Sequence, residues 1–393
     1  MIDGKFVIDA VSHGYDYAPQ NRAESCEIDR YRRLGLFMAV RSHAVLESAE
    51  PGLCLAPEEY LVRWTPEAIA NTLFVESDVD MTCYHEVRID AHTAEGVSRW
   101  DTGVGLRDIA PDRVLLYAYV DTFAPDRERV FDEMRDKVSK GAVGFKFYPS
   151  NGMFDENRTL VQAKYDDPEH AYPYFEHARS LGIRHLAFHK AQPVGPGTIE
   201  ALKVNDLTTA AGAFPDMTFE VVHDGYHFID ECSSQLRIVP NIYANLEVTM
   251  NLIVRQPRRF AEILGRFLLY AGSSRLLHAT GCIFQHPEPI LKAFRDFEMP
   301  KDLKEGYGYP DVTDEDKANI LGLNFARLHN VDITAVRERI KDDHWSQLRR
   351  KGKPAPWTAH RRIINEASYP FVKYAQQDFT ENDWRAFTHG IAL

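Results

Sequence analysis

Short apolar runs recur along the chain, separated by longer segments in which charged and apolar residues alternate at helical spacing. The runs span residues 5–11, 79–86, 113–121, 143–148, 184–189, 218–223, 241–247 and 275–281. Apolar runs of this length indicate strands that are buried on both faces, as in parallel sheets. Helical segments between successive strands are typical of βα units. The pattern predicts an α/β protein with a (β/α)8 or TIM barrel, and a doubly wound open sheet is the alternative.

Five segments between the apolar runs have the composition and spacing of helices. They cover residues 126–140, 168–181, 197–213, 227–238 and 256–271. Gly182 and Gly272 follow two of them directly, and glycine is a favoured residue just beyond the end of a helix. Two of the helix boundaries are therefore defined by the sequence itself.

Two long segments fall outside the repeating pattern. We assign residues 1–332 to the barrel, with an insertion at about 15–75 that acts as a lid or dimer arm, and 333–393 to a C-terminal extension. The extension should pack on the barrel or on a partner subunit. Its aromatic residues favour a homodimer interface or a sizeable apolar substrate; they are Trp345, Trp357, Tyr369, Phe371, Tyr374 and Trp384.

Composition narrows the possible partners. The chain has 58 acidic and 46 basic residues and a net charge of −12, which disfavours binding to nucleic acid. The basic run at 349–353 is better explained as a solvated face. The five cysteines contain no C-x-x-C pair, as in reduced intracellular proteins, and no apolar stretch is long enough to span a membrane. We expect a cytoplasmic protein that acts on a small molecule.

Three of the apolar runs end at or near a histidine. His13 follows the first, His189 ends the fifth and His223 ends the sixth. Active sites of (β/α)8 barrels lie at the C-terminal ends of the strands, so these imidazoles should meet there. Each one alone fits a hydrogen-bonded structural histidine. Three at similar depth indicate a shared divalent metal, because neutral imidazole is the commonest metal ligand.

Several motifs between residue 5 and about 332 carry a family resemblance. They are VIDAVSH at the first strand, GFKFYPSNGMF at the fourth, LAFHK and VVHDG at the fifth and sixth, and TDEDKANILGLNFARLHNVD at 313–332. In these motifs the chain resembles the amidohydrolase-related proteins, in the branch of aminocarboxymuconate-semialdehyde decarboxylase, resorcylate decarboxylases, lactonases and hydratases. The resemblance implies a metal-dependent barrel enzyme. Thr313 and Asp316 also provide an N-terminal cap for the last of these segments.

The chain departs from the family pattern at two ligand positions. Val11 stands where the first-strand motif has a histidine, and Gly281 stands where the eighth strand normally ends in a metal-binding aspartate. A replacement carboxylate is available at Glu247 of the seventh strand, which shares a strand face with Asn245. The predicted metal ligands are His13, His189, His223 and Glu247. For Glu247 the alternative is an outward surface glutamate or a loop residue.

Three further residues are candidates for catalysis. On the fourth strand of related hydrolases, a lysine at the position of Lys146 is either carboxylated to bridge two metals or remains an amine that binds a substrate carboxylate. An ordinary lysine paired with an acid is the alternative. Asp224 and His286 are candidates for moving the proton, since Asp224 follows His223 and His286 lies just beyond the eighth strand.

Together these features predict a metal-dependent hydrolase. One or two divalent ions, Zn, Fe or Mn, would activate water to cleave a carboxylic ester, thioester, lactone or amide of a fairly large apolar substrate. Non-oxidative decarboxylation of an aromatic or enolic acid is the second hypothesis. A catalytically inactive barrel is the third.

Overall fold

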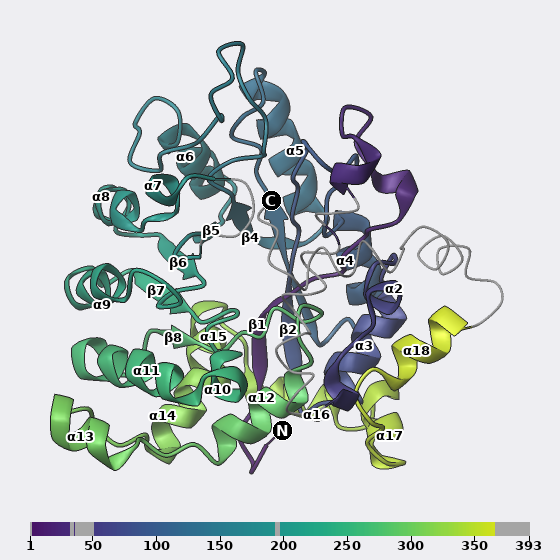
Figure 1. Cartoon of the computed structure of the whole chain (residues 1–393), viewed down its shortest axis with the longest axis vertical. Coiled ribbons are helices and arrows are strands. Elements are labelled where there is room, and N and C mark those ends of the chain that lie inside the picture. The colour runs from purple at the N-terminus through teal and green to yellow at the C-terminus, as the bar shows by residue number, and fades with distance from the viewer. Residues whose placement is uncertain (1, 32–34, 36–50, 193–196, 366–393) are drawn as a thin grey trace.

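A computed structural model describes residues 2–31, 35, 51–192 and 197–365 of the 393-residue chain. Eight parallel strands follow one another around the sheet in chain order (Figure 1). This order confirms the predicted (β/α)8 barrel and excludes the doubly wound sheet, in which the strand order reverses. The strands are β1 Ile8–Ser12, β2 Met81–His85, β3 Val114–Tyr119, β4 Ala142–Phe147, β5 His185–His189, β6 Thr218–Val222, β7 Ile242–Asn245 and β8 Leu276–Leu277.

The segment that follows β8 closes the barrel against β1. Ala10 N donates to His278 O at 2.9 Å, Gly281 N donates to Val11 O at 3.1 Å, and Cys282 pairs in parallel with Ser12. The eighth apolar run thus lies beside the first, although only two of its residues have regular strand geometry. Closure brings the ends of the first and last strands to one rim.

Helices surround the strands in the outer ring shown in Figure 1. No helix of the described ranges is long and apolar enough to cross a membrane. The shorter elements are η1 Pro19–Asn21, η2 Pro51–Leu53, α2 Pro57–Tyr60, α7 Ile199–Leu202, α10 Leu252–Arg255, α13 Lys301–Tyr307, α14 Asp314–Ala318, the π-helical η3 Asn319–Leu323, α15 Asn324–Leu328 and α17 His344–Arg350. The longer ones are α3 Pro66–Phe74, α4 Trp100–Ile109, α5 Arg127–Ser139, α6 Tyr172–Ser180, α8 Asn205–Ala213, α9 Ile229–Ile238, α11 Pro257–Ala271, α12 Pro287–Arg295, α16 Ile333–Ile340 and α18 Thr358–Asn365.

The helix boundaries follow from local chemistry. Gly272, at a φ of 66°, ends α11 and donates its N–H to Leu268 O. The Thr313 hydroxyl accepts from Asp316 N at 3.1 Å while the Asp316 carboxylate accepts from Thr313 N at 3.0 Å, so the expected cap is a complete capping box. The predicted helix at 197–213 is instead two helices, α7 and α8, which break at Lys203 and Val204.

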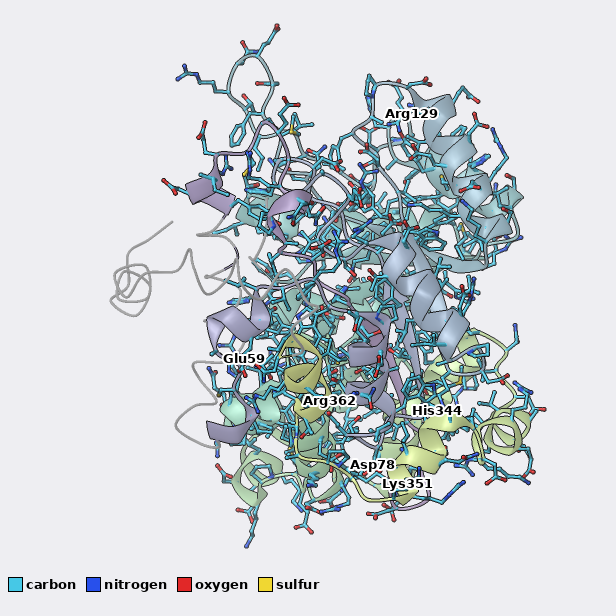
Figure 2. The ribbon with its side chains drawn as sticks, turned by 90° about the vertical axis from the view of Figure 1, so that its right-hand side faces the viewer. Glu59, Asp78, Arg129, His344, Lys351 and Arg362 are labelled. Carbon is cyan, nitrogen blue, oxygen red and sulfur yellow. The ribbon has the colours of Figure 1, made fainter. Side chains whose placement is uncertain are left out.

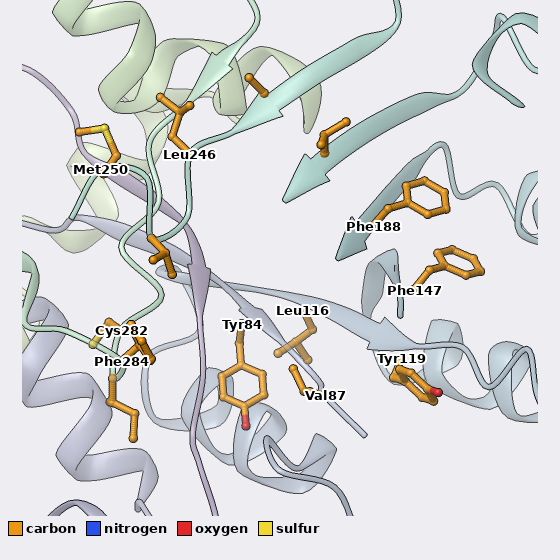
Figure 3. Packing of buried hydrophobic residues seen from close by; sticks show 14 of the residues in the cluster. Tyr84, Val87, Leu116, Tyr119, Phe147, Phe188, Leu246, Met250, Cys282 and Phe284 are labelled. Atoms are coloured by element: carbon orange, nitrogen blue, oxygen red, sulfur yellow. The ribbon is translucent and has the colours of Figure 1, made fainter. Parts of the chain in front are cut away.

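Aromatic rings pack between the strands and the helices on one side of the barrel. The rings of Phe147 in β4 and Phe188 in β5 lie 5.0 Å apart (Figure 3). The Phe188 ring also lies 5.4 Å from that of Phe219 in β6. Rings of this size bury large apolar areas and lock neighbouring strands in register. The packing of these rings holds the backbone at Lys146 and His189 in place, because Lys146 directly precedes Phe147 and His189 directly follows Phe188.

The C-terminal extension packs on α3 and on the described part of the insertion. The His360 ring stacks on Trp64 at 3.6 Å, and the Trp357 ring lies 5.6 Å from Trp64. Arg361 pairs with Glu59 at 2.9 Å. Figure 2 shows this face, with α17 and α18 against the body of the barrel.

A buried carboxylate joins the extension to the loop beyond β8. Glu76, just past α3, is fully buried and accepts from the backbone N–H groups of Trp357 and Ala359, both at 2.8 Å. It also accepts from His286 Nε2 at 3.2 Å. The Glu76 carboxylate therefore connects the end of α3 to the C-terminal extension and to the start of α12.

Glu76→Ala should lower the free energy of unfolding by about 2–4 kcal/mol, because three buried N–H donors lose their acceptor. The measurement is urea denaturation followed by circular dichroism. Glu67→Ala is the control: it removes a glutamate from the exposed Arg362 pair, and such pairs contribute at most about 1 kcal/mol. Equal losses from the two substitutions would contradict this role for Glu76.

Candidate active site

Polar side chains gather where the parallel strands end. His13 follows β1, Lys146 lies in β4, His189 ends β5, and His223 comes directly after β6; Glu247 lies two residues past β7. Each of these side chains is at least nine-tenths buried. Buried polar groups require partners, so their mutual contacts define the chemistry of this rim.

His189, His223 and Glu247 form a continuous hydrogen-bonded chain. His223 Nε2 lies 3.0 Å from His189 Nδ1, and His223 Nδ1 lies 2.6 Å from Glu247 Oε2. A carboxylate only accepts, so His223 Nδ1 carries the proton of that contact. The Nε2 lone pair of a neutral His223 then faces His189.

Glu247 is the electrostatic centre of the rim. Burial raises the pKa of its carboxyl, but the contact with His223 and the positive charge of Lys146 bring the pKa below its usual range. Its exposed fraction of 3% excludes an outward surface glutamate, but Glu247 is a loop residue past the end of β7 and not the strand residue that was predicted. The carboxylate therefore stays charged and accepts the hydrogen bond of His223.

The Glu247 carboxylate occupies the space beside Gly281. A Cβ atom added at Gly281 would clash with Glu247 Oε1 and lie 3.0 Å from Glu247 Cδ. Gly281 also has a φ of 66°, a conformation that favours glycine. The space beside Gly281, where the resemblance led us to expect an aspartate, is thus filled by a carboxylate from the loop after β7.

Lys146 lies deeper, between two buried carboxylates. Burial lowers the pKa of its ammonium to about 8, against the opposing effect of Glu247 and Glu220. Its Nζ lies 5.4 Å from the centre of the Tyr148 ring, and that ring stacks on His189 at 4.5 Å. Among the described residues no carboxylate forms an ion pair with Lys146, so the predicted alternative of an ordinary paired lysine is not observed there.

Glu220 of β6 is a second buried carboxylate whose charge acts on Lys146. It was not among the residues predicted from the sequence. Its carboxylate accepts from Tyr117 OH and, at 3.0 Å, from Asn245 Nδ2, and burial raises its pKa. The only signal was a glutamate inside the apolar run TFEVV. A charged residue within a run that is otherwise buried on both faces points into the barrel.

His13 stands across the rim from this chain. Its Nδ1 lies 3.1 Å from His85 O, and its ring stacks on Tyr15 at 5.3 Å. Burial lowers the pKa of His13 to about 4, although the nearby Glu247 charge acts in the opposite direction. His13 is therefore a neutral imidazole at physiological pH.

Asp224 and His286 are not brought into this cluster. Asp224 lies beside Cys232 of α9, where burial raises its pKa to about 7. His286 is fully buried between Glu76 and the start of α12, and its Nδ1 accepts from Glu288 N at 3.2 Å. The contacts of His286 with Glu76 and Glu288 do not support its predicted role in proton transfer. The role of Asp224 stays a prediction.

The loops that carry the site are held in unusual conformations. His223 and Val248 have φ values of 70° and 61°, and the second is costly for a β-branched residue. Thr249 Oγ1 donates to Asp224 O at 2.8 Å and Asn251 Nδ2 donates to Thr280 O at 3.2 Å, so the loops after β6, β7 and β8 are tied together. Strain of this kind gathers at functional sites.

The predicted metal site is present only in part. Within the described residues no three His, Cys, Asp or Glu side chains are arranged to hold a metal ion. His189 Nδ1 and His223 Nε2 face each other, as two ligands of one ion would. Glu247 contacts the opposite nitrogen of His223, and the Nδ1 of His13 faces a backbone carbonyl. The imidazole pair suits a divalent transition metal but is not a complete ligand set.

Comparison with protein families gives one match. A family model described as Amidohydrolase matches residues 74–330, which include β2 to β8 and the segment through α15. No curated protein matches the chain.

Solved structures with the same fold share little sequence with this chain. An uncharacterised TIM-barrel protein of Bordetella bronchiseptica has a TM-score of 0.53 at 16% identity, over 83% of this chain and 98% of that one. A putative metal-dependent hydrolase of Lactobacillus casei has 0.53 at 13%, over 84% and 96%. The 2,6-dihydroxybenzoate decarboxylase of Rhizobium has 0.51 at 12%, over 84% and 99%. At these identities the likeness concerns the fold alone.

The lowered pKa of Lys146 predicts a pH-dependent stability. A folded-state pKa of about 8 lies below the ordinary 10.5, so the folded protein binds this proton more weakly than the unfolded chain. The contribution of Lys146 to the free energy of unfolding is full above about pH 10.5 and is lost as the pH falls through 8. Relative to Lys146→Met, wild-type stability should therefore fall by on the order of 3 kcal/mol over this range.

Urea denaturation of both proteins between pH 7.5 and 10.5 measures this difference. Lys140→Met, at a position with a half-exposed ammonium, is the control for general alkaline effects. A difference between wild type and Lys146→Met that stays constant with pH would contradict the buried position of this amine.

Proposed function

The chain belongs to the amidohydrolase family, and on this premise we propose that it hydrolyses a carboxylic ester, thioester, lactone or amide of a fairly large apolar small molecule. The observation that carries the proposal is the buried chain of His189, His223 and Glu247. Hydrolysis requires a group that takes a proton from water and returns it to the leaving group. Two imidazoles in contact, backed by a carboxylate, are suited to that task.

Different residues would transfer the proton, bind the oxyanion and contact the substrate. A proton taken up by either imidazole is shared across the 3.0 Å contact, and the positive charge is balanced by the Glu247 carboxylate. Lys146, which has both protonation states near pH 8, can hold the developing oxyanion as an ammonium. The rings of Tyr15 and Tyr148, stacked on His13 and His189, provide apolar surface for the substrate.

Membership of the family supports a divalent metal in this reaction. His189 and His223 would hold it, and their imidazoles suit Zn, Fe or Mn, as one or two ions. His13 and Glu247, which were also predicted as ligands, face other partners in this structure. When bound, such an ion acidifies water and polarises the substrate carbonyl. The burial of the imidazole pair excludes competing solvent from the same atoms.

Decarboxylation is the second candidate. It is favoured by the position of Lys146, a buried amine with no carboxylate in ion-pair contact among the described residues. Such an amine is suited to bind the carboxylate of an aromatic or enolic acid, and a decarboxylase of Rhizobium has the same fold. An inactive barrel is the remaining hypothesis. A homodimer in the cytoplasm stays a prediction.

Metal content tests the proposed centre. The purified protein should contain close to one or two equivalents of Zn, Fe or Mn, and His189→Ala and His223→Ala should each remove most of it. His170→Ala, at an exposed position, is the control. Elemental analysis by mass spectrometry measures all four proteins. Wild-type protein without metal, after growth in metal-supplemented medium, would contradict the metal-dependent proposal.

The two reactions are separated by product. On a panel of aromatic esters, thioesters, lactones and matched free acids, hydrolysis releases an acid without gas, and decarboxylation releases carbon dioxide. We expect hydrolysis to dominate and His223→Ala to reduce kcat/KM by about 100-fold or more. Carbon dioxide release from the free acids without ester cleavage would favour the second candidate instead.

A further inference from the structure

We propose that Glu247 is a positioning residue: its carboxylate fills the space that Gly281 leaves open, and from there it fixes the tautomer and orientation of His223. The proposal rests on the proposed function for its catalytic meaning, since it concerns the same imidazole pair. It assigns Glu247 a role through His223 rather than as a ligand in its own right.

The contacts of His223 support this assignment. Two acceptors of the same residue face His223 Nδ1, Glu247 Oε2 at 2.6 Å and the Glu247 carbonyl oxygen at 3.3 Å. With two acceptors at Nδ1, the neutral ring is protonated there and bare at Nε2. The bare nitrogen is the one that faces His189, 3.0 Å away.

Gly281 makes this position available to the carboxylate. Any side chain at residue 281 would begin where Glu247 Oε1 now lies, and its Cβ would be 3.2 Å from Glu247 Cγ. The carboxylate thus has His223 on one side and the Gly281 backbone on the other. The space that Gly281 leaves by having no side chain therefore matches the Glu247 carboxylate, which reaches it from the loop after β7.

The backbone after β7 delivers the side chain to this position. Glu247 N donates to Asn245 Oδ1 at 3.3 Å, Thr249 N donates to Glu247 O at 2.7 Å, and Val248 between them has a φ of 61°. Asn251 Nδ2 then donates to Thr280 O, next to Gly281. Hydrogen bonds therefore connect the loop that carries the Glu247 carboxylate to the segment around Gly281.

A carboxylate on the far nitrogen of a histidine acts on a metal indirectly. It raises the basicity of the ring and holds its other nitrogen toward the ion, and removal of such a partner weakens metal binding or activity by about 10–100-fold. A direct ligand would share the ion with His189, but Glu247 lies on the opposite nitrogen of His223.

The test compares Glu247→Ala, Gly281→Ala and the double variant by two-bond ¹H–¹⁵N spectra of histidine-labelled protein, which distinguish the tautomers of each ring. His223→Gln assigns the His223 signals. In metal-free wild type, His223 should be protonated at Nδ1. Both single variants should lower the Nδ1-protonated fraction below that of wild type, because one removes the carboxylate and the other displaces it. Only the weaker backbone acceptor at 3.3 Å then remains at Nδ1.

Gly272→Ala is the matched control, since Gly272 has the same φ of 66° but no atom within 4 Å of an added Cβ. It should leave the His223 signals unchanged. Zn²⁺ titration against a chelator gives a second readout: both single variants should bind Zn²⁺ about 10–100-fold more weakly, and the double variant no more weakly than Glu247→Ala.

An unchanged Nδ1-protonated His223 in Glu247→Ala would overturn the proposal, and so would a Gly281→Ala variant that behaves like Gly272→Ala. If Gly281→Ala does not fold, the spectrum of Glu247→Ala decides alone. The proposed function fails separately: a wild type that binds no Zn²⁺ and hydrolyses no substrate would refute it, while the tautomer result would still stand.

Discussion

Parallel pairing between β1 and the segment beyond β8 is the constraint on which the site depends. Asp9 of β1 accepts from Thr280 N at 2.9 Å, and Gly281 N donates to Val11 O one residue further on. This pairing closes the sheet and sets Gly281 next to the end of β7. The Glu247 carboxylate then lies over Gly281, and the imidazole chain is built outward from it.

The same loop connects the site to the outside of the barrel. A short stretch beyond Gly281 ends at His286, which donates to Glu76, and Glu76 accepts the backbone of the C-terminal extension. The extension therefore supports the loop that shapes the site, although none of its described contacts reaches the imidazole pair. The Glu76 contacts therefore contribute both to the stability of the fold and to the position of the loop beside the site.

The sequence predicted the strands because each is an apolar run. Strand alternation identified Glu247 as a candidate, but Glu247 lies in the loop after β7, and the conformation of that loop directs its side chain. The sequence did not predict the surroundings of Asp224 or His286. The φ of 70° at His223 directs the next residue toward α9, and His286 meets Glu76 from more than two hundred positions away in the chain. The sequence could not predict that the Glu247 carboxylate fills the space beside Gly281, because the two residues are brought together only by the fold.

The most direct measurement is a neutron crystal structure of the deuterated wild-type protein, because it locates the hydrogen atoms of the buried chain. We predict a deuteron on His223 Nδ1 directed at the Glu247 carboxylate, none on His223 Nε2, and His189 Nδ1 in contact with that bare nitrogen. A Glu247 side chain turned away from Gly281, or a deuteron on His223 Nε2 with Nδ1 bare, would contradict this arrangement.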